Sequence, residues 1–276
     1  MSVSIALVYP DLLGTYGDSG NAAILAQRLR WRGQDAEVLT ISAADSVPAG
    51  CDLYVIGGGE DLPQGLAASK LNAGQALHRA VDNGAVVLAV CAGFQIMGER
   101  FVSPDGHASE GLGLLDCATV PSSAPRAIGE VLVEPSPQWH GSGLSVLTGF
   151  ENHGAVTELG PGAQPVGQVR LGVGNKDGTV EGAVAGRIWA TYMHGPALAR
   201  NPHLADLLLS WVVGPLEPLG PAGPLDDSEP DALHAERVER AAAERRGDGP
   251  RTWAGKSARW WGRAAGAVRR RGDGGR

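Results

Sequence analysis

The sequence is poor in cysteine and in long apolar runs, and these two shortages exclude two classes of protein. Its three cysteines, Cys51, Cys91 and Cys117, are an odd number without close spacing, which does not fit a disulfide framework. No apolar run approaches the ~20 residues that a membrane-spanning helix needs. The N-terminal segment also lacks the basic start of a secretory signal. We therefore expect a protein of the reducing cytosol, neither secreted nor membrane-spanning.

Apolar residues and charges are present in number, but the charges are unevenly distributed. Of the 276 residues, 43% are hydrophobic, enough for one sizeable core. The net charge is −7, yet residues 251–276 hold eight basic residues against Asp273 alone. Residues 215–231 are rich in proline, glycine and acid, which is typical of a linker. The predicted organisation is a domain over 1–213, a linker over 214–231, and a poorly ordered charged helix and basic tail over 232–276.

The basic tail has two interpretations. If it is helical, its lysine and arginines share a face next to Trp260 and Trp261, a pattern that suits weak contact with an anionic membrane surface. Plain disorder explains the composition equally well.

The order of the apolar segments predicts the fold class. Strand-like runs at 3–9, 36–41, 53–59 and 85–90 alternate with helix-like segments at 21–32 and 70–83, and further strand-like runs follow at 126–133, 166–172 and 187–193. Apolar strands that alternate with helices favour a mostly parallel sheet covered on both faces, an α/β doubly wound fold. In such sheets ligands bind at the carboxyl ends of the strands.

One cysteine stands at such a strand end. In "AVVLAVCAGFQIMGE" a buried strand runs into Cys91, and Ala92 and Gly93 then permit a sharp turn into a helix. A thiol held near the positive end of a helix has a lowered pKa and is exposed for attack. The other interpretation, a small buried hydrophobic residue, is the one that we adopt for Cys51 and Cys117.

Three further motifs contain groups that would serve such a thiol. "GGGED" at 57–61 follows a strand, and its backbone N–H groups, with that of Ala92, could stabilise an oxyanion. "TYMHG" at 191–195 places His194 directly after a buried strand, as a base that keeps the thiol ionised. "GFENHGA" at 149–155 is a polar cluster. Each motif taken alone could be an ordinary turn or a structural histidine.

Together "GGGED", "AVCAGFQIMGE", "GFENHGAVT" and "ATYMHG" resemble, in this order, the motifs of class I glutamine amidotransferases of the branch similar to cobyric acid synthases. More narrowly, they resemble the glutamine amidotransferase subunits of lipid II isoglutaminyl synthases. The resemblance covers about residues 1–213. It implies a flavodoxin-like domain that hydrolyses glutamine to glutamate and ammonia.

The resemblance also implies roles for individual residues. Cys91 is then the nucleophile and His194 the base. The implied substrate-binding residues are Arg126 as a clamp on the glutamine α-carboxylate, Gly58 and Gly59 on the oxyanion side, and Gln95 near the nucleophile. The planar fork of an arginine suits a carboxylate, although "APRAIGE" could equally present a surface arginine.

One position departs from the family pattern. Many class I amidotransferases carry a glutamate two residues after the histidine, where this sequence has Pro196. A histidine base needs an orienting acceptor. We therefore expect either a Cys–His dyad or a borrowed carboxylate, and we favour one from a partner subunit.

A partner is also implied by what the ammonia is used for. Amide formation from a carboxylate requires ATP, and no G-x-x-x-x-G-K-[ST] loop is present; "GPRTWAGKS" from Gly249 is one residue too long and follows no strand. The resemblance implies a heterodimer with a Mur-ligase-like synthetase that binds ATP and Mg²⁺. That subunit would amidate the D-glutamate α-carboxylate of lipid II to D-isoglutamine at the inner face of the membrane. No cofactor, metal or nucleic acid is expected on this chain.

Three alternatives remain. A cobyric-acid-type amidotransferase would use the same Cys–His chemistry, but is normally fused to an ATP-dependent domain. A free-standing cysteine hydrolase of γ-glutamyl bonds would need no partner. A non-catalytic scaffold would have no need of both Cys91 and His194.

Overall fold

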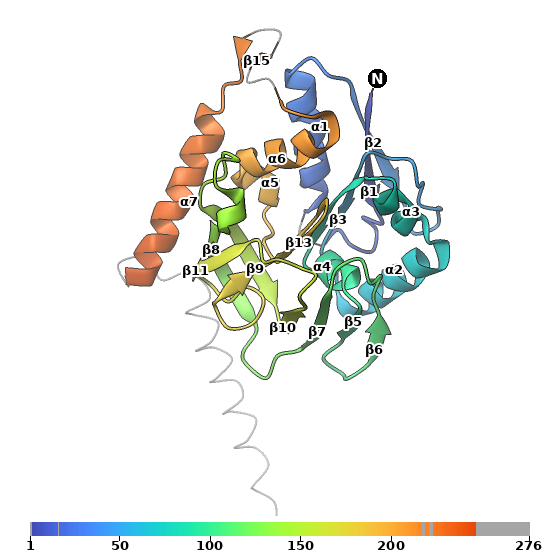
Figure 1. The fold of residues 1–276 in the computed structure, drawn as a ribbon. Helices are drawn as coiled ribbons and strands as arrows, with labels where there is room; N and C mark the ends of the chain where they lie inside the picture. Colours follow the sequence, from blue (N-terminus) through green and yellow to red (C-terminus); the bar gives the residue numbers. More distant parts are fainter. Residues whose placement is uncertain (1, 16, 217–218, 221–222, 247–276) are drawn as a thin grey trace, which may run out of the picture.

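A mostly parallel six-stranded sheet forms the centre of the computed structural model, which describes residues 2–15, 17–216, 219–220 and 223–246. Its strand order is β13-β14-β4-β3-β1-β2. The strands are β1 (Val3–Val8), β2 (Ala36–Ile41), β3 (Leu53–Ile56), β4 (Val86–Val90), β13 (Ala183–Ala185) and β14 (Ile188–Thr191). All neighbours are parallel except the edge strand β13. The parallel part has the 2-1-3-4-5 order of flavodoxin-like sheets, which confirms the predicted fold class (Figure 1).

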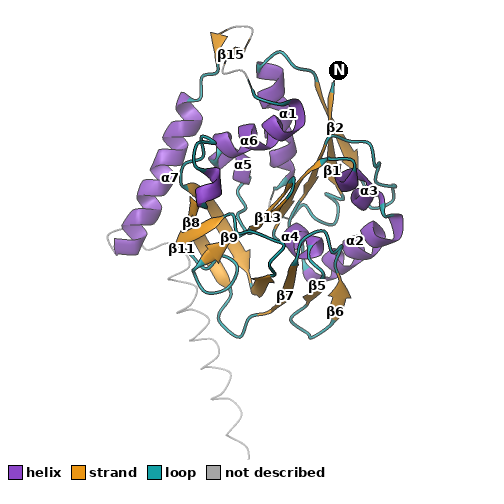
Figure 2. Cartoon of the chain, in the orientation of Figure 1, coloured by secondary structure: helices purple, strands orange, loops and turns teal. Residues whose placement is uncertain are grey.

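Helices cover both faces of this sheet (Figure 2). On one side lie α1 (Ser19–Trp31), α5 (Ala197–Arg200) and α6 (Pro202–Val213), which contact one another. On the other lie α2 (Asp61–Gly74), α3 (Ala76–Asp82) and α4 (Ala92–Met97). The single helix predicted over 70–83 is in fact two, because Gln75 adopts a left-handed conformation (φ 51°) that ends α2.

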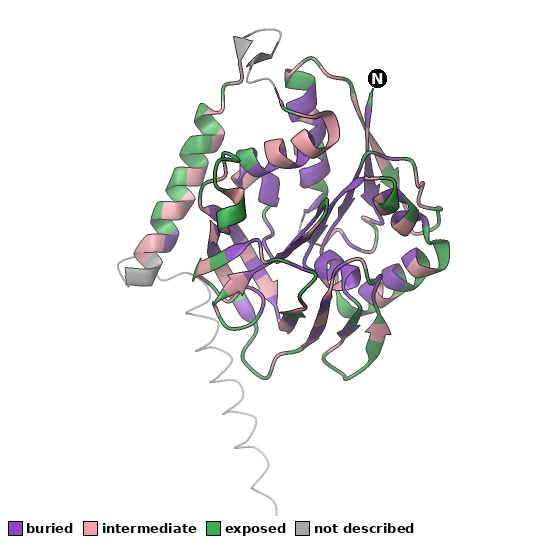
Figure 3. Ribbon diagram, viewed as in Figure 1, coloured by how far each residue is buried: buried purple, intermediate pink, exposed green. Residues whose placement is uncertain are grey.

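The middle of the sheet is buried throughout, which explains its apolar strands. Every residue of β3, β4 and β14 is buried between the two helical layers, and buried residues concentrate in this sheet (Figure 3). Burial on both faces is what a continuous run of valine, leucine and alanine predicts.

Antiparallel strands form a second region beside the parallel sheet. One sheet has the order β10-β7-β5-β6 and another β12-β11-β8-β9. The strands are β5 (Arg100–Val102), β6 (Ala108–Glu110), β7 (Cys117–Pro121), β8 (Ala127–Pro135), β9 (Leu147–His153), β10 (Ala155–Leu159), β11 (Gly167–Leu171) and β12 (Val180–Glu181), with a 3-10 turn η1 at Pro137–Trp139. Phe150 of β9 exchanges two backbone hydrogen bonds with His194, 3.1 and 2.9 Å long, and so joins the second region to the end of β14.

The charged segment after the predicted linker forms a helix that packs on the body. Helix α7 (Ser228–Arg246) begins within the predicted linker, after the short strands β15 (Leu219–Gly220) and β16 (Gly223–Pro224). The buried guanidinium of Arg28 in α1 donates to Asp206 of α6 and to Asp227 next to α7, at 2.6 to 2.9 Å. Ala241 of α7 is fully buried. This docking depends on two carboxylates that are far from Arg28 along the chain, so no local sequence pattern predicts it.

Among the helices that the structure describes, none combines the length and the apolar character needed to cross a membrane. The basic tail, and the membrane contact predicted for it, lie outside the described residues.

Candidate active site

Cys91 occupies a sharp turn between β4 and α4. Its backbone has φ 52° and ψ −105°, a region that non-glycine residues rarely adopt. The turn is held by a 2.8 Å hydrogen bond from its N–H to the carbonyl of Thr191 in β14. A Cβ on Gly93 would lie 2.6 Å from the carbonyl oxygen of Ile56, so only glycine lets α4 start this close to β3. The strand, turn and helix therefore form the strained elbow that exposes a nucleophile.

His194 lies at the carboxyl end of β14, next to the elbow. It is 2% exposed, and its backbone is fixed by the pair of hydrogen bonds to Phe150. Its ring and the Cys91 side chain both lie against Gly58, because a Cβ there would be 2.6 Å from Cε1 of His194 and 3.4 Å from Cβ of Cys91. The structure thus brings together the two residues predicted to be catalytic from positions 103 apart in the sequence.

The carboxylate that orients His194 comes from this chain. Asp18, directly before α1, is fully buried, and its Oδ2 lies 3.1 Å from Nδ1 of His194. The same oxygen accepts the N–H of Gly58 at 2.9 Å. A carboxylate of this chain therefore lies where one from a partner subunit was expected, and the arrangement within the chain is Cys91, His194, Asp18.

Pro196 packs against the start of α1, the helix that directly follows Asp18. A Cβ on Gly20, in the first turn of α1, would lie 2.4 Å from Cγ of Pro196. The start of α1 therefore packs directly on the residue that stands where a glutamate would follow the histidine. This close packing brings Asp18 to His194 and explains how the chain does without a glutamate at 196.

The charges around His194 favour its protonated form. Burial lowers the pKa of the imidazole, but the hydrogen bonds to Asp18 and Cys91 and their negative charges outweigh burial and raise it well above its ordinary value. An imidazolium between a thiolate and a carboxylate is the charge state expected of a Cys–His nucleophile pair.

The two other cysteines lie in different surroundings. Both Cys51 and Cys117 are buried. Burial raises the pKa of the Cys51 thiol, and it raises the pKa of the Cys117 thiol to about 12. A raised pKa disfavours the reactive thiolate. Their interpretation as packing residues fits these surroundings.

A pocket opens beside Cys91 and contains most of the predicted substrate-binding residues. Its walls come from the ends of β3 and β4 and from the antiparallel region, and include Gly59, Ala92, Gln95 and Arg126. Gly58 is different, because its N–H is donated to Asp18 and is not available to a substrate. Gly58 is the glycine on which Asp18, His194 and Cys91 converge.

Arg126 is positioned by Asn152 of the "GFENHGA" motif. Its Nε donates to Oδ1 of Asn152 at 2.6 Å, and one terminal nitrogen donates to the carbonyl of Asn152 at 3.0 Å. The side chain of Arg126 is exposed at the pocket, at the start of β8. The guanidinium is therefore oriented by its neighbour rather than by burial.

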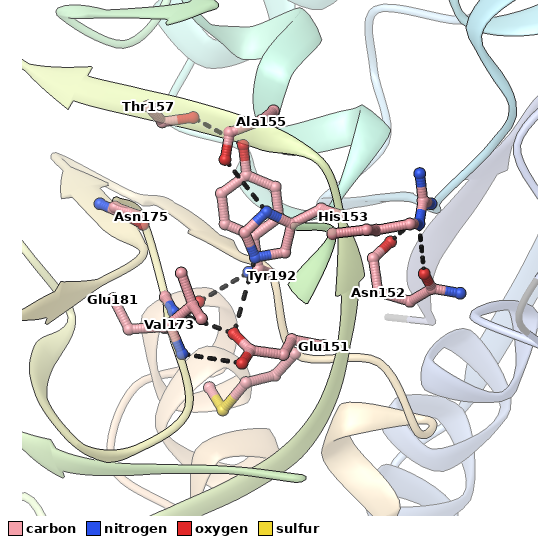
Figure 4. Close-up of polar contacts among 12 residues, drawn as sticks. Glu151, Asn152, His153, Ala155, Thr157, Val173, Asn175, Glu181 and Tyr192 are labelled. Atoms are coloured by element: carbon pink, nitrogen blue, oxygen red, sulfur yellow. Dashed lines mark hydrogen bonds and ion pairs between the residues drawn. The ribbon is translucent and has the colours of Figure 1, made fainter. Parts of the chain in front are cut away.

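The residues on either side of Asn152 point into the protein instead (Figure 4). The ring of His153 stacks on Tyr192 with centroids 3.9 Å apart, and Glu151 accepts the N–H groups of Val173 and Gly174 at 2.7 and 2.9 Å. This alternation is the two-residue period of a strand. The motif thus serves the pocket through Asn152 and the packing of the second region through Glu151 and His153.

Gln95 is fixed by a chain of side-chain hydrogen bonds. Its Oε1 accepts from Nε2 of Gln64 at 2.7 Å, and its Nε2 donates to the hydroxyl of Tyr192 at 3.2 Å. The Tyr192 hydroxyl is 2.6 Å from the hydroxyl of Thr157. Gln64 and Gln95 both line the pocket, so the amide near the nucleophile has a defined orientation.

A second buried carboxylate lies at the junction of the two regions. Glu181 is fully buried, and its Oε1 accepts from the Thr191 hydroxyl at 2.8 Å and from the Tyr192 N–H at 2.6 Å. Burial, with a smaller contribution from the charge of Glu151, raises the pKa of Glu181 to about 7. Glu181 thus ties β12 to the end of β14, close to His194.

Comparison with known proteins agrees with this geometry. Residues 4–202 match the CobB/CobQ-like glutamine amidotransferase domain. The chain belongs to this family. It is 35% identical over 202 residues to the lipid II isoglutaminyl synthase (glutamine-hydrolyzing) subunit GatD of Staphylococcus aureus, covering 72% of this chain and 79% of that protein. The GatD subunit of Streptococcus pneumoniae is 34% identical over 75% of this chain and 79% of its own length.

Other members of the CobB/CobQ-like family are similar over a smaller share of their length. The cobyric acid synthase of Azorhizobium caulinodans is 34% identical over 58% of this chain, but that match covers 32% of the synthase. The narrower resemblance to the GatD subunits is thereby confirmed.

Several residues of the site were missed from the sequence of this amidotransferase domain. Asp18 lies in "TYGDSGN", where an aspartate before a helix indicates only an N-terminal cap. Gln64 lies in none of the motifs, and Asn152 lies in "GFENHGA", a motif whose pattern alone assigns it no role. Their roles depend on contacts across 31 and 26 positions, respectively, which a single sequence does not display.

Proposed function

We propose that this chain hydrolyses glutamine at Cys91 and supplies the ammonia to an ATP-dependent partner. The observation that carries the proposal is the convergence of Cys91, His194 and Asp18 on Gly58 at a strained elbow that opens into the Arg126 pocket. The names of the GatD relatives, which state that those proteins are glutamine-hydrolysing, support the same reaction.

In the first step the Cys91 thiolate attacks the γ-carboxamide carbon of glutamine. The carbonyl oxygen becomes an oxyanion, for which the N–H groups of Gly59 and Ala92 are the proposed donors. Ala92 is the first residue of α4, so its N–H has no acceptor within the helix. The imidazolium of His194 then protonates the leaving nitrogen. The carbon–nitrogen bond breaks, releasing ammonia and leaving a γ-glutamyl thioester on Cys91.

In the second step water attacks the thioester. Neutral His194 accepts the proton of that water, the carbon–sulfur bond breaks, and glutamate leaves as the thiolate is restored. Asp18 holds the ring through Nδ1 in both steps and stabilises the imidazolium. Arg126 is the proposed clamp on the α-carboxylate, and Gln95 contacts the substrate near the nucleophile.

The use of the ammonia is proposed by analogy with the GatD relatives, which are named as subunits of lipid II isoglutaminyl synthase. The partner would be a Mur-ligase-like synthetase that binds ATP and Mg²⁺ and phosphorylates the D-glutamate α-carboxylate of lipid II. Ammonia from this chain displaces the phosphate and yields D-isoglutamine in peptidoglycan synthesis. This reaction places the heterodimer in the cytoplasm, at the inner face of the membrane.

Covalent labelling tests the glutaminase assignment. A glutamine-analogue electrophile should label the wild type at Cys91, and Cys91→Ala should lose both the label and glutamate release while keeping the thermal unfolding midpoint of the wild type. Cys51→Ala and Cys117→Ala are the matched controls and should keep the label. Labelling that maps to Cys51 or Cys117 would overturn the assignment.

Reconstitution tests the proposed pathway. The chain and its co-expressed synthetase, given lipid II, ATP, Mg²⁺ and glutamine, should produce amidated lipid II. Cys91→Ala should abolish amidation from glutamine and keep amidation from added ammonium salts. If the variant complex also fails to amidate lipid II from ammonium while the wild-type complex is active, the proposal that this chain only releases ammonia and the partner carries out amidation is wrong.

A further inference from the structure

The charged residues of the site pocket have a defined order from the inside to the mouth. Cys91 is 7% exposed at the inner end, whereas Arg126 and Asp61 are both exposed. Asp61 also lines a second, larger groove that runs along α2 toward β6, so it lies where the pocket meets the surface. Of the described residues that line the pocket, Asp61 alone carries a carboxylate.

This order matches the charge distribution of free glutamine. The γ-carboxamide is neutral and must reach Cys91, while the α-carboxylate and the α-ammonium sit together at the other end of the molecule. Arg126 offers the positive charge for the α-carboxylate. A negative group at the mouth is then needed for the ammonium, and charge-assisted hydrogen bonds are the strong ones.

Asp61 stands at the start of a helix, and the described residues offer it no competing cation. It is the first residue of α2, and a carboxylate in the first turn of a helix is stabilised by the helix dipole. Among the described residues Asp61 forms no ion pair. Gly59, the proposed oxyanion donor, is two residues away, so the same loop would contact the ammonium and the reacting carbonyl.

We propose that Asp61 binds the α-ammonium group of glutamine and restricts the site to the free amino acid. This inference rests on the proposed glutaminase function, and it assigns a residue to the α-ammonium, which none of the other proposed site residues binds. A glutaminyl residue within a peptide lacks both the α-ammonium and the free α-carboxylate, so it would lose the contacts with Asp61 and Arg126 together.

The test compares glutamine with glutaramate, which is glutamine without its α-amino group. For the wild type, kcat/KM should favour glutamine by about tenfold or more, the value of one charge-assisted hydrogen bond. Asp61→Asn should raise KM for glutamine about tenfold with kcat within about twofold, and should leave glutaramate unchanged. Where glutaramate turns over too slowly, its inhibition constant against glutamine replaces KM.

Glu60→Gln is the matched control, because Glu60 is exposed, carries the same charge one residue earlier and does not line the pocket. It should behave as the wild type with both compounds. If Asp61→Asn keeps the preference for glutamine, or if Glu60→Gln loses it equally, the assignment is overturned. Failure of the glutaminase function itself would appear differently, as no glutamate release by the wild-type chain.

Discussion

The two ends of the pocket are built in opposite ways. At the inner end, Asp18, His194 and Cys91 are buried at the edge of the parallel sheet and held by backbone and side-chain hydrogen bonds. At the mouth, Arg126 is exposed on the antiparallel region and is oriented by Asn152. Bond making needs fixed geometry without competing water, whereas recognition of a charged amino acid needs accessible charge. The difference predicts that changes at the inner end affect kcat and changes at the mouth affect KM.

The largest expected effect comes from removing the buried carboxylate. Asp18→Asn keeps the shape of the side chain but no longer stabilises the imidazolium, and we expect kcat to fall by ~10²- to 10⁴-fold with KM little changed, as for the orienting aspartate of a serine protease triad. Steady-state glutamate release measures both constants. Asp11→Asn is the control, because Asp11 lies in the same segment but is exposed, and its carboxylate accepts the N–H of Ala43.

Repeating the kinetics with the synthetase subunit added tests whether Asp18 or the partner orients His194. If Asp18→Asn has the kcat of the wild type when isolated, and the partner then raises both equally, the orienting carboxylate belongs to the partner after all. A deficit that persists in the complex confirms that Asp18 orients His194 in the working enzyme.

The inner end was also the more predictable from sequence. Cys91 and His194 follow apolar strands, and the strand pattern alone places both at the same edge of a parallel sheet. Asp18 was not found because its partner lies 176 positions away, and its neighbours indicate only a helix start. Pro196 was noticed as a departure, but its contact with Gly20 depends on how α1 packs, which periodicity does not specify.

The mouth was predictable only through resemblance. Arg126 lies at the first position of a strand-like run, which assigns it no role, and the hydrogen bonds that orient it come from a strand 26 positions later. Antiparallel strands with turn-rich connections carry weak alternation, so the pairing of β8 with β9 could not be derived. The docking of α7 could not be predicted for a related reason, because the ion pairs of Arg28 join residues that are 178 and 199 positions apart.

Titration of Glu181, at the junction of the two regions, should have a smaller effect, on the pH dependence of the free energy of unfolding. Its pKa of about 7 in the folded protein exceeds the ~4.5 of an unfolded glutamate. Between these values the unfolded chain binds fewer protons, so the free energy of unfolding should fall as pH rises through this window, by on the order of 3 kcal/mol, and then stay level. Glu181→Gln keeps an oxygen for Thr191 and Tyr192 and should remove most of that fall. Urea unfolding at about pH 5 and about pH 8 measures it.

A wild type whose unfolding free energy is the same at both pH values would show that Glu181 does not titrate in this window. Glu158→Gln is the control, because Glu158 is an exposed carboxylate paired with Lys176, and the pH dependence of that variant should follow the wild type.

The smallest expected effect is at the mouth, where two variants separate the charge of Arg126 from its orientation by Asn152. Arg126→Lys keeps a cation but loses the planar fork, and we expect KM for glutamine to rise about tenfold with kcat within about twofold. Asn152→Ala should raise KM less, by about threefold, because it removes the side-chain acceptor of the guanidinium but keeps the backbone carbonyl at residue 152. If Asn152 acts by orienting Arg126, the double variant should be no worse than Arg126→Lys alone. Additive losses would instead mean that Asn152 contacts glutamine directly, and a loss confined to kcat would move Arg126 to the inner end.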